Sequence, residues 1–120
     1  MKYLTLLIVI AVAVLALWLM AGVRAPKQSA LALQSFAQCL TDKGFTMYGA
    51  YWCPHCQNEK ALFGEAFDRV QYVECTKEPA RCTAAGIEGF PTWVTDDGRR
   101  FQGEQGLERL SEASGCRITE

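Results

Sequence analysis

Residues 52–56 read Trp-Cys-Pro-His-Cys and separate two runs of different periodicity. The run before them, 45–51, has the pattern of a buried strand, and the run after them, 57–67, has apolar residues at helical spacing. A Cys-x-x-Cys pair is thereby placed where a strand passes into a helix. The partial positive charge and free N–H groups of a helix N-terminus favour a thiolate at Cys53, and the thiolate is the form that attacks a disulfide. The motif therefore predicts a thiol pair that closes into a disulfide and exchanges it with another protein.

A zinc site is another common use of a Cys-x-x-Cys pair. Such a site takes four ligands, usually from a second pair of this kind or from two histidines. The chain has a single histidine, His55, and no second Cys-x-x-Cys. We therefore interpret Cys53 and Cys56 as a redox pair without a metal, in which a protonated His55 adds positive charge beside the thiolate.

The composition narrows the class of protein. The chain has 120 residues, of which six are cysteines, and a formal net charge of −1. So small a net charge gives no sign of the basic surface that binds nucleic acid. Six cysteines in so short a chain suit an oxidising compartment rather than a reducing cytosol. We expect the folded part to lie on the oxidising side of a membrane.

An uncharged N-terminal run predicts a membrane segment. Residues 3–23 carry no charge and would span about 32 Å as a helix, enough to cross the ~30 Å hydrocarbon core of a bilayer. Tyr3 and Trp18 lie near its ends, where interfacial aromatic residues are expected. A cleaved signal peptide is the alternative, but its apolar region is usually ~7–15 residues long, and the candidate cleavage sites here are poor. We expect an uncleaved anchor over 1–24, a linker over 25–30 and one domain over 31–120.

Helical and strand patterns alternate along the domain. They predict, in chain order, a helix before Gly44, a strand at 45–51, a helix at 57–67, a strand at 70–75, a helix at 78–85, a hairpin of 92–95 with 99–102, and a last helix closed by Gly115. The inner stripe of the 57–67 helix is expected to be Leu62, Phe63, Ala66 and Phe67. Glu59 and Lys60 are expected on its solvated face. This order predicts an α/β domain whose central mixed sheet has helices on both faces.

The motif, the order of elements and Gly-Phe-Pro-Thr at 89–92 together resemble a thioredoxin fold over roughly Leu31 to Gly115. Four segments are similar to the thioredoxin-like domain of bacterial and plant homologues of vitamin K epoxide reductase (VKOR): YGAYWCPHCQ at 48–57, KALFG at 60–64, YVEC at 72–75 and FPTW at 90–93. In that family the domain is often fused to a four-helix membrane enzyme that passes electrons to quinone. The resemblance implies a stand-alone, membrane-anchored partner of such an enzyme.

The resemblance also implies roles for the two motif cysteines. Cys53 is implied as the exposed nucleophile and Cys56 as the buried thiol that resolves a mixed disulfide. Thioredoxin itself has a buried Asp six residues before its first motif cysteine, where this chain has Met47, and a nearby Lys where this chain has Tyr72. A buried carboxylate can accept the proton when the resolving thiol attacks, so its replacement marks a departure from thioredoxin.

Pro54 and His55 lie between the cysteines, and this pair makes the chain more similar to the periplasmic oxidases than to thioredoxin. His55 is implied to stabilise the reduced, thiolate form. Stabilising the reduced form makes the disulfide a stronger oxidant.

The segment around Pro91 is implied to form the docking site. Pro91 is expected to follow a cis peptide bond and to face the cysteine pair. Cis X-Pro bonds are uncommon, so such a bond would be a specific feature of the fold. Phe90 and Pro91 are expected to shape where the backbone of a protein partner docks. Trp52, which precedes the nucleophile, is expected to shield it.

Four cysteines remain outside the motif: Cys39, Cys75, Cys82 and Cys116. If the motif pair closes on itself, these four allow three connectivities. Cys75 ends a predicted strand and Cys82 lies on the next helix, so this pair can close locally and leave Cys39 to meet Cys116. We expect both bonds to be structural. A second redox pair at Cys75 and Cys82, relaying electrons to or from the motif, is the alternative.

These observations favour a membrane-anchored thiol–disulfide oxidoreductase that holds no bound cofactor and works through its Cys53–Cys56 disulfide. Its expected partners are protein thiols and disulfides and a quinone-linked, VKOR-type membrane enzyme. Its expected location is the bacterial periplasm or another extracytoplasmic space, or the thylakoid lumen of a cyanobacterium. Three alternatives stay open: a reductant or isomerase, for example in cytochrome maturation; a copper- or zinc-binding module; and a redox-inactive domain that holds peptides near Phe90 and Pro91.

Overall fold

The computed structural model describes the backbone of residues 1–21 and 25–118 and the side chains of residues 1–20 and 30–118. The elements in chain order are α1 (Lys2–Ala21), α2 (Ala25–Asp42), β1 (Phe45–Gly49), α3 (Pro54–Phe63), the 3₁₀ helix η1 (Gly64–Arg69), β2 (Gln71–Glu74), α4 (Pro79–Ala84), β3 (Thr92–Thr95), β4 (Arg100–Gln102) and α5 (Gly106–Ser114). The predicted order of helices and strands is confirmed. The predicted mixed α/β class, with an apolar helix at the N-terminus, is confirmed as well.

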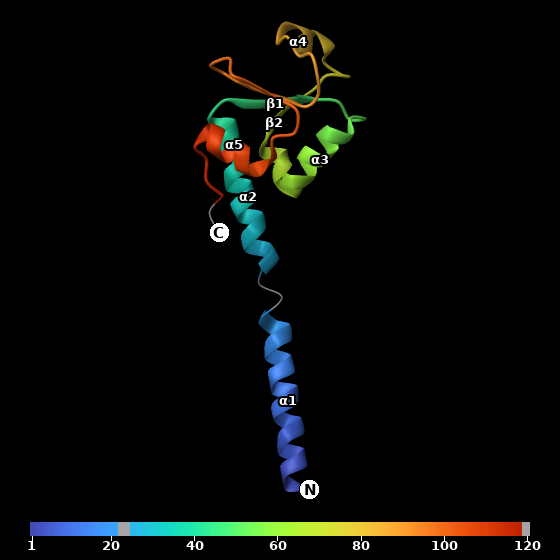
Figure 1. Ribbon diagram of the computed structural model, residues 1–120, viewed down its shortest axis with the longest axis vertical. Coiled ribbons are helices and arrows are strands. Elements are labelled where there is room, and N and C mark those ends of the chain that lie inside the picture. Colours follow the sequence, from blue (N-terminus) through green and yellow to red (C-terminus); the bar gives the residue numbers. More distant parts are fainter. Residues whose placement is uncertain (22–24, 119–120) are drawn as a thin grey trace.

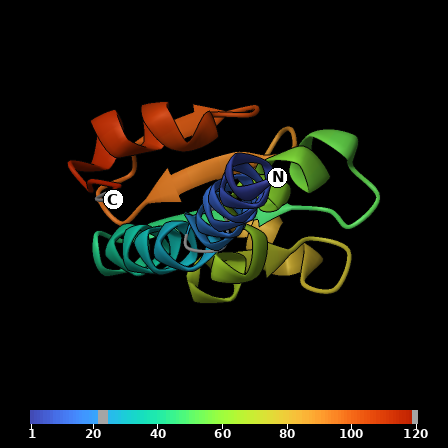
Figure 2. The same ribbon diagram turned by 90° about the horizontal axis from the view of Figure 1, so that it is seen from below.

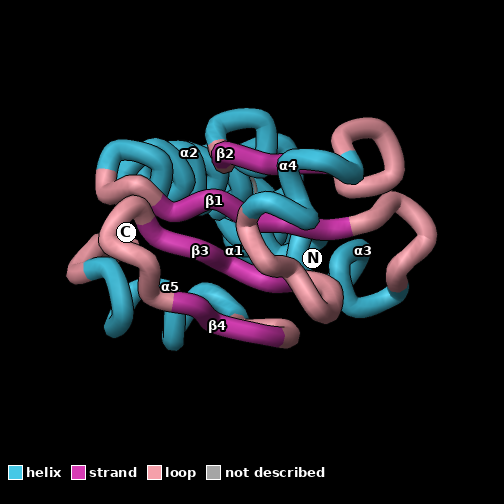
Figure 3. Tube along the Cα trace, turned by 90° about the horizontal axis from the view of Figure 1, so that it is seen from above, coloured by secondary structure: helices cyan, strands magenta, loops and turns pink. Residues whose placement is uncertain are grey.

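The sheet has four strands in the order β2-β1-β3-β4. β1 pairs in parallel with β2 and antiparallel with β3, and β4 pairs antiparallel with β3. The register sets Met47 between Tyr72 and Trp93, and it sets Gly49 beside Glu74. Because directly paired residues lie on the same face, these five side-chain positions share one face of the sheet. β2 is an edge strand, as Figure 3 shows.

Helices cover the two faces of the sheet unequally. α2, α3 and α5 lie together on one face, below the strands in Figure 1 and in front of them in Figure 2. They enclose the main core, whose largest buried side chains include Phe36, Phe45, Phe63 and Trp93. α4 lies on the opposite face (Figure 1), where a small second cluster consists of Val73, Cys75 and Cys82. The prediction of helices on both faces is therefore confirmed, with most of the core on one of them.

Helix α3 begins and ends earlier than the sequence predicts. It begins at Pro54, where the proline ring sets a helical φ and the missing N–H removes no intrahelical hydrogen bond. It ends at Phe63, because Gly64 adopts a φ of +55°, in the region that favours glycine, and η1 follows. The single helix predicted over 57–67 is wrong for this reason.

The inner face of α3 also differs from the prediction. Its buried residues are Cys56, Glu59 and Phe63, which follow helical spacing from the second cysteine. Glu59 is fully buried rather than solvated, and Leu62 is 45% exposed rather than part of the inner stripe. The other three residues of the predicted stripe are confirmed, since Phe63 and Ala66 are buried and Phe67 packs against the main core.

Two disulfides connect distant or weakly packed parts of the domain. Cys39 on α2 is bonded to Cys116 after α5, across a sequence separation of 77 residues. Cys75, just after β2, is bonded to Cys82 on α4, across a separation of 7 residues. The first bond lies at the main core and the second lies in the small cluster on the other face.

Helix α1 is a candidate membrane span. Among the described residues, Lys2–Met20 form the one helix that is long and apolar enough to cross a bilayer, and none of this stretch is buried against the domain. Figure 1 shows it projecting away from the sheet. A signal sequence would have the same length and composition. The expected linker over 25–30 falls in the first turns of α2, and the expected boundary at residue 24 lies outside the described residues, so the division into anchor, linker and domain stays a prediction.

Candidate active site

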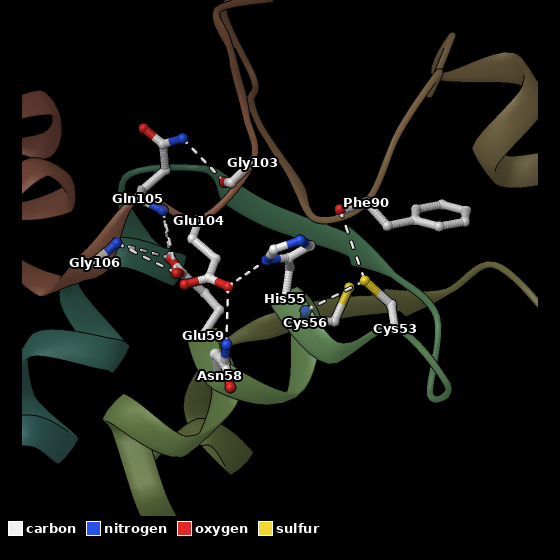
Figure 4. Close-up of polar contacts among 10 residues, drawn as sticks. All are labelled: Cys53, His55, Cys56, Asn58, Glu59, Phe90, Gly103, Glu104, Gln105 and Gly106. Carbon is white, nitrogen blue, oxygen red and sulfur yellow. Dashed lines mark hydrogen bonds and ion pairs between the residues drawn. The ribbon is translucent and has the colours of Figure 1, made fainter.

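Cys53 is the N-cap residue of α3. The chain turns out of β1 through a hydrogen bond from the Cys53 N–H to the Ala50 carbonyl, 3.1 Å long, and α3 starts at the next residue. The Cys53 Sγ accepts a hydrogen bond from the Cys56 N–H at 3.4 Å and donates its own hydrogen to the Phe90 carbonyl at 3.7 Å (Figure 4). Cys53 as a residue is only 5% exposed, so the exposed nucleophile implied by the resemblance is corrected to one held just beneath the surface by these contacts.

Cys56 lies one helical turn further, on the inner face of α3, and is completely buried. Both motif cysteines are free thiols in the structure. Burial raises the pKa of the Cys56 thiol to about 12, an effect that a hydrogen bond with the backbone of Ala50 partly offsets. The pair therefore consists of a thiol near the surface at a helix start and a thiol in the core that holds its proton at neutral pH.

The segment before β3 borders the nucleophile. The Phe90–Pro91 peptide bond is cis, and Pro91 itself is buried. The Phe90 ring packs edge to face with Trp52, with centroids 6.1 Å apart. Trp52 is 57% exposed, so it forms part of the rim beside Cys53 rather than a cover over it.

His55 points away from the cysteines toward the loop that follows β4 (Figure 4). Its Nδ1 lies 2.7 Å from Oε1 of Glu104, and the same oxygen accepts a hydrogen bond from Asn58 Nδ2 at 3.1 Å. The hydrogen bond with His55 is the main cause of a lowered pKa of the Glu104 carboxyl. When the imidazole is protonated, this contact becomes an exposed ion pair. Sequence analysis missed Glu104, because 49 residues separate it from His55 and no local pattern joins them.

Glu59 holds the start of α5 against α3. Its carboxylate accepts hydrogen bonds from the Trp93 indole N–H at 3.1 Å and from the backbone N–H groups of Gln105 and Gly106 at 3.1–3.3 Å. A carboxylate at a helix N-terminus is stabilised by the free N–H groups there and by the helix dipole. The loop that presents Glu104 to His55 is thereby anchored from below (Figure 4). Helical spacing counted from Cys56 would have placed Glu59 on the inner face.

The described residues form no metal site beyond the two motif thiols. No three His, Cys, Asp or Glu side chains among them are grouped to hold a metal ion. The donors of the motif itself are two thiols, since the His55 ring is turned toward Glu104.

Comparison with known proteins agrees with this geometry. No protein-family model matches the chain. The chain is 42% identical over 90 residues to "Thiol-disulfide oxidoreductase LTO1" of Arabidopsis thaliana, and the alignment covers 68% of this chain and 24% of that protein. The chain thus spans about a quarter of the length of this relative. The similarity, together with the sheet topology and the Cys53–Cys56 pair at a helix start, supports a thioredoxin-like, thiol–disulfide oxidoreductase family for the chain.

Proposed function

We propose that this protein is a membrane-anchored thiol–disulfide oxidoreductase whose redox group is the Cys53–Cys56 pair. One observation carries the proposal: the Cys53 sulfur lies between the N–H groups at the start of α3 and the Phe90 carbonyl next to cis-Pro91, with Cys56 directly behind it. The helix start stabilises a thiolate at Cys53 when it attacks or leaves. The exposed Trp52 and the backbone near Phe90 form a surface on which a partner polypeptide can dock.

The exchange takes place in two steps. A partner thiolate attacks the Cys53 sulfur of the Cys53–Cys56 disulfide, which forms a mixed disulfide and releases Cys56 as a thiolate that takes up a proton. A second partner thiolate then attacks its own sulfur in the mixed disulfide and releases the Cys53 thiolate. The partner loses two electrons and gains a disulfide, and the domain is left as a dithiol. The reverse sequence reduces a partner disulfide.

In the direction that we propose, the domain is the oxidant. Pro54 and His55 between the cysteines support this direction through the resemblance to periplasmic oxidases. The two formed disulfides at Cys39–Cys116 and Cys75–Cys82 fit an oxidising compartment. We propose that a quinone-linked membrane enzyme of the VKOR type reoxidises the dithiol, and that α1 keeps the domain beside it and so raises the effective concentration of the two proteins.

The proposal is tested with the full chain in detergent micelles, by following the oxidation of a dithiol peptide. Cys53→Ser should abolish exchange. Cys56→Ser, given the same peptide in its disulfide form, should accumulate a mixed disulfide at Cys53 that dithiothreitol releases, because the Cys53 thiolate attacks the peptide disulfide and no second motif thiol resolves the product. The matched control, Cys75→Ala with Cys82→Ala, should still exchange if that bond is structural. Full activity of Cys53→Ser would refute the proposal.

Reduction potential distinguishes the two directions. Equilibration of the full chain in glutathione buffers should give about −120 to −180 mV for the Cys53–Cys56 couple, the range of oxidases and isomerases. A value near about −270 mV, the thioredoxin range, would reverse the proposed direction and make the protein a reductant.

The mass of the purified protein shows whether the N-terminal helix is retained as an anchor. The protein purified from the membrane fraction should have the mass of the full chain, 13.3 kDa. A loss of roughly 2–3 kDa, the size of an ordinary signal peptide, would show cleavage instead.

A further inference from the structure

The buried thiol of Cys56 needs a route for its proton. To resolve a mixed disulfide, Cys56 must attack as a thiolate, and in the reverse direction it leaves as a thiolate and must be protonated. It is completely buried, and burial raises its pKa to about 12. Met47, on the sheet face that packs against α3, offers no group that can accept a proton. The proton must therefore pass through another side chain or through solvent that enters the core.

Cys56 and Tyr72 both pack closely over Gly49. A Cβ atom at Gly49 would lie 2.9 Å from the Cys56 Sγ and 3.2 Å from the Tyr72 hydroxyl oxygen. Both atoms thus approach the same point, which they can do because residue 49 has no side chain. Alanine at this position would collide with the sulfur, since real Cβ contacts are not this short.

The Tyr72 hydroxyl connects Gly49 to the edge of the sheet. Its O–H donates a hydrogen bond to Oε1 of Glu74, 3.1 Å long, so the lone pairs of the phenolic oxygen are free to accept from another group. Tyr72 and Glu74 lie two residues apart on β2 and so face the same side of the sheet. β2 is the edge strand, and Glu74 is half-buried with its second oxygen on the exposed Thr76. The line from Cys56 through Tyr72 to Glu74 therefore runs from the core to solvent.

We propose that Tyr72 and Glu74 form the proton relay of Cys56. As Cys56 attacks the mixed disulfide at Cys53, the two side chains over Gly49 approach each other or take one water between them, and the Cys56 proton passes to the Tyr72 oxygen. The phenolic proton passes at the same time to the Glu74 carboxylate and from there to water. The new bond joins Cys56 to Cys53, and the partner leaves as a thiolate. In the oxidising direction the proton moves back along the same groups. The proposal rests on the disulfide exchange proposed above and holds for either direction of electron flow.

The charged and titratable groups around the relay are compatible with this role. From α3, the Lys60 ammonium lies 3.8 Å from the centroid of the Tyr72 ring, and its charge favours the Cys56 thiolate to a small extent. Burial, and then the nearby Glu74 carboxylate, raise the pKa of Tyr72, so this group remains a neutral hydroxyl. Among the described residues, Cys53 is the other titratable group that acts on the Cys56 thiol. A neutral hydroxyl that accepts one proton and gives another needs no ionised intermediate.

The test measures the resolving step alone, in the full chain in detergent micelles. Cys53 is loaded with a chromophoric aromatic thiol as a mixed disulfide, and release of that thiol reports the attack of Cys56. Tyr72→Phe should slow release of the thiol at pH 7 by about tenfold or more. General acid–base catalysis contributes ~100-fold or more, and water that enters in place of the hydroxyl would restore part of that rate. The deficit should shrink as the pH rises, because hydroxide replaces the relay. Glu74→Gln should slow release in the same way without a change in the core.

Controls separate the relay from packing. Tyr48→Phe removes the same hydroxyl on the opposite face of the sheet, beside the small cluster, and should leave the release rate unchanged. Thermal melting checks that Tyr72→Phe is folded. Wild-type rates at every pH in both Tyr72→Phe and Glu74→Gln, or slowing that does not depend on pH, would overturn the relay while leaving the proposed function intact. A wild-type protein that releases no thiol would overturn both proposals.

Discussion

The two faces of the sheet are stabilised in different ways. Three helices cover one face over a core that contains most of the aromatic side chains and the buried Glu59 carboxylate. On the other face, α4 alone covers a cluster made of Val73, Cys75 and Cys82. Three side chains bury little apolar surface, so the Cys75–Cys82 bond supplies a larger share of the stability on that face. One face therefore depends on packing and the other on a covalent cross-link.

The functional groups are divided in the same way. Cys53, Cys56 and Tyr72 all belong to the main core, whereas Phe90 contacts both clusters. The thiol chemistry is therefore supported by the well-packed face, and the docking segment also depends on the weakly packed one. Loss of α4 should weaken partner docking more than it changes the reactivity of the cysteines.

The largest expected effect comes from the long disulfide on the packed face. Replacing Cys39 and Cys116 together by Ala should reduce the free energy of unfolding by up to about 4.5 kcal/mol, because the closed loop spans 77 residues. Urea unfolding of the full chain in detergent measures this loss of free energy. A loss smaller than that of the short disulfide would contradict the dependence on loop length.

The next effect concerns Glu59. Glu59→Ala should reduce the free energy of unfolding by about 3 kcal/mol or more, because it leaves the buried N–H groups of Trp93, Gln105 and Gly106 without an acceptor. Glu59→Gln keeps one acceptor oxygen and should cost less. Glu65→Ala, at an exposed position nearby, should change the stability by no more than about 0.5 kcal/mol. Equal losses for the Glu59 and Glu65 variants would show that the buried network contributes nothing.

The short disulfide tests the weakly packed face. Cys75→Ala with Cys82→Ala should cost up to about 2.5 kcal/mol, because its loop closes over only 7 residues. Amide hydrogen exchange should accelerate in α4 and leave α3 and β1 protected, since the main core does not include that bond. Uniform acceleration across the domain would contradict the division between the two faces.

The smallest expected effect lies at the surface. Glu104 has a lowered pKa because His55 and then Asn58 donate hydrogen bonds to it, so it contributes stability above its ordinary carboxyl pKa of 4.5 and loses that contribution as the pH falls through the lowered value. Glu104→Gln should therefore lower the urea midpoint slightly at neutral pH and not at about pH 2, where the wild-type carboxyl is protonated too. A difference that persists in acid would have another cause.

Local pattern was sufficient for much of the fold. The strand predicted at 92–95 is observed as Thr92–Thr95, and Gly115 ends the last helix in a left-handed conformation. Alternation, turn residues and helix-ending glycines act within a few residues of one another, so they can be read without knowledge of the fold. The same reasoning placed the Cys-x-x-Cys pair at the junction of a strand and a helix, where the structure has it.

The tertiary structure decided which side chains surround that pair. Glu59 became an internal acceptor because α5 begins over α3, and Glu104 met His55 because the loop after β4 returns to the motif. Cys56 and Tyr72 meet over Gly49 because β1 and β2 pair in a register that brings this glycine under the helix. These contacts join residues far apart in the chain, and their geometry follows from how whole elements pack, which no local pattern encodes.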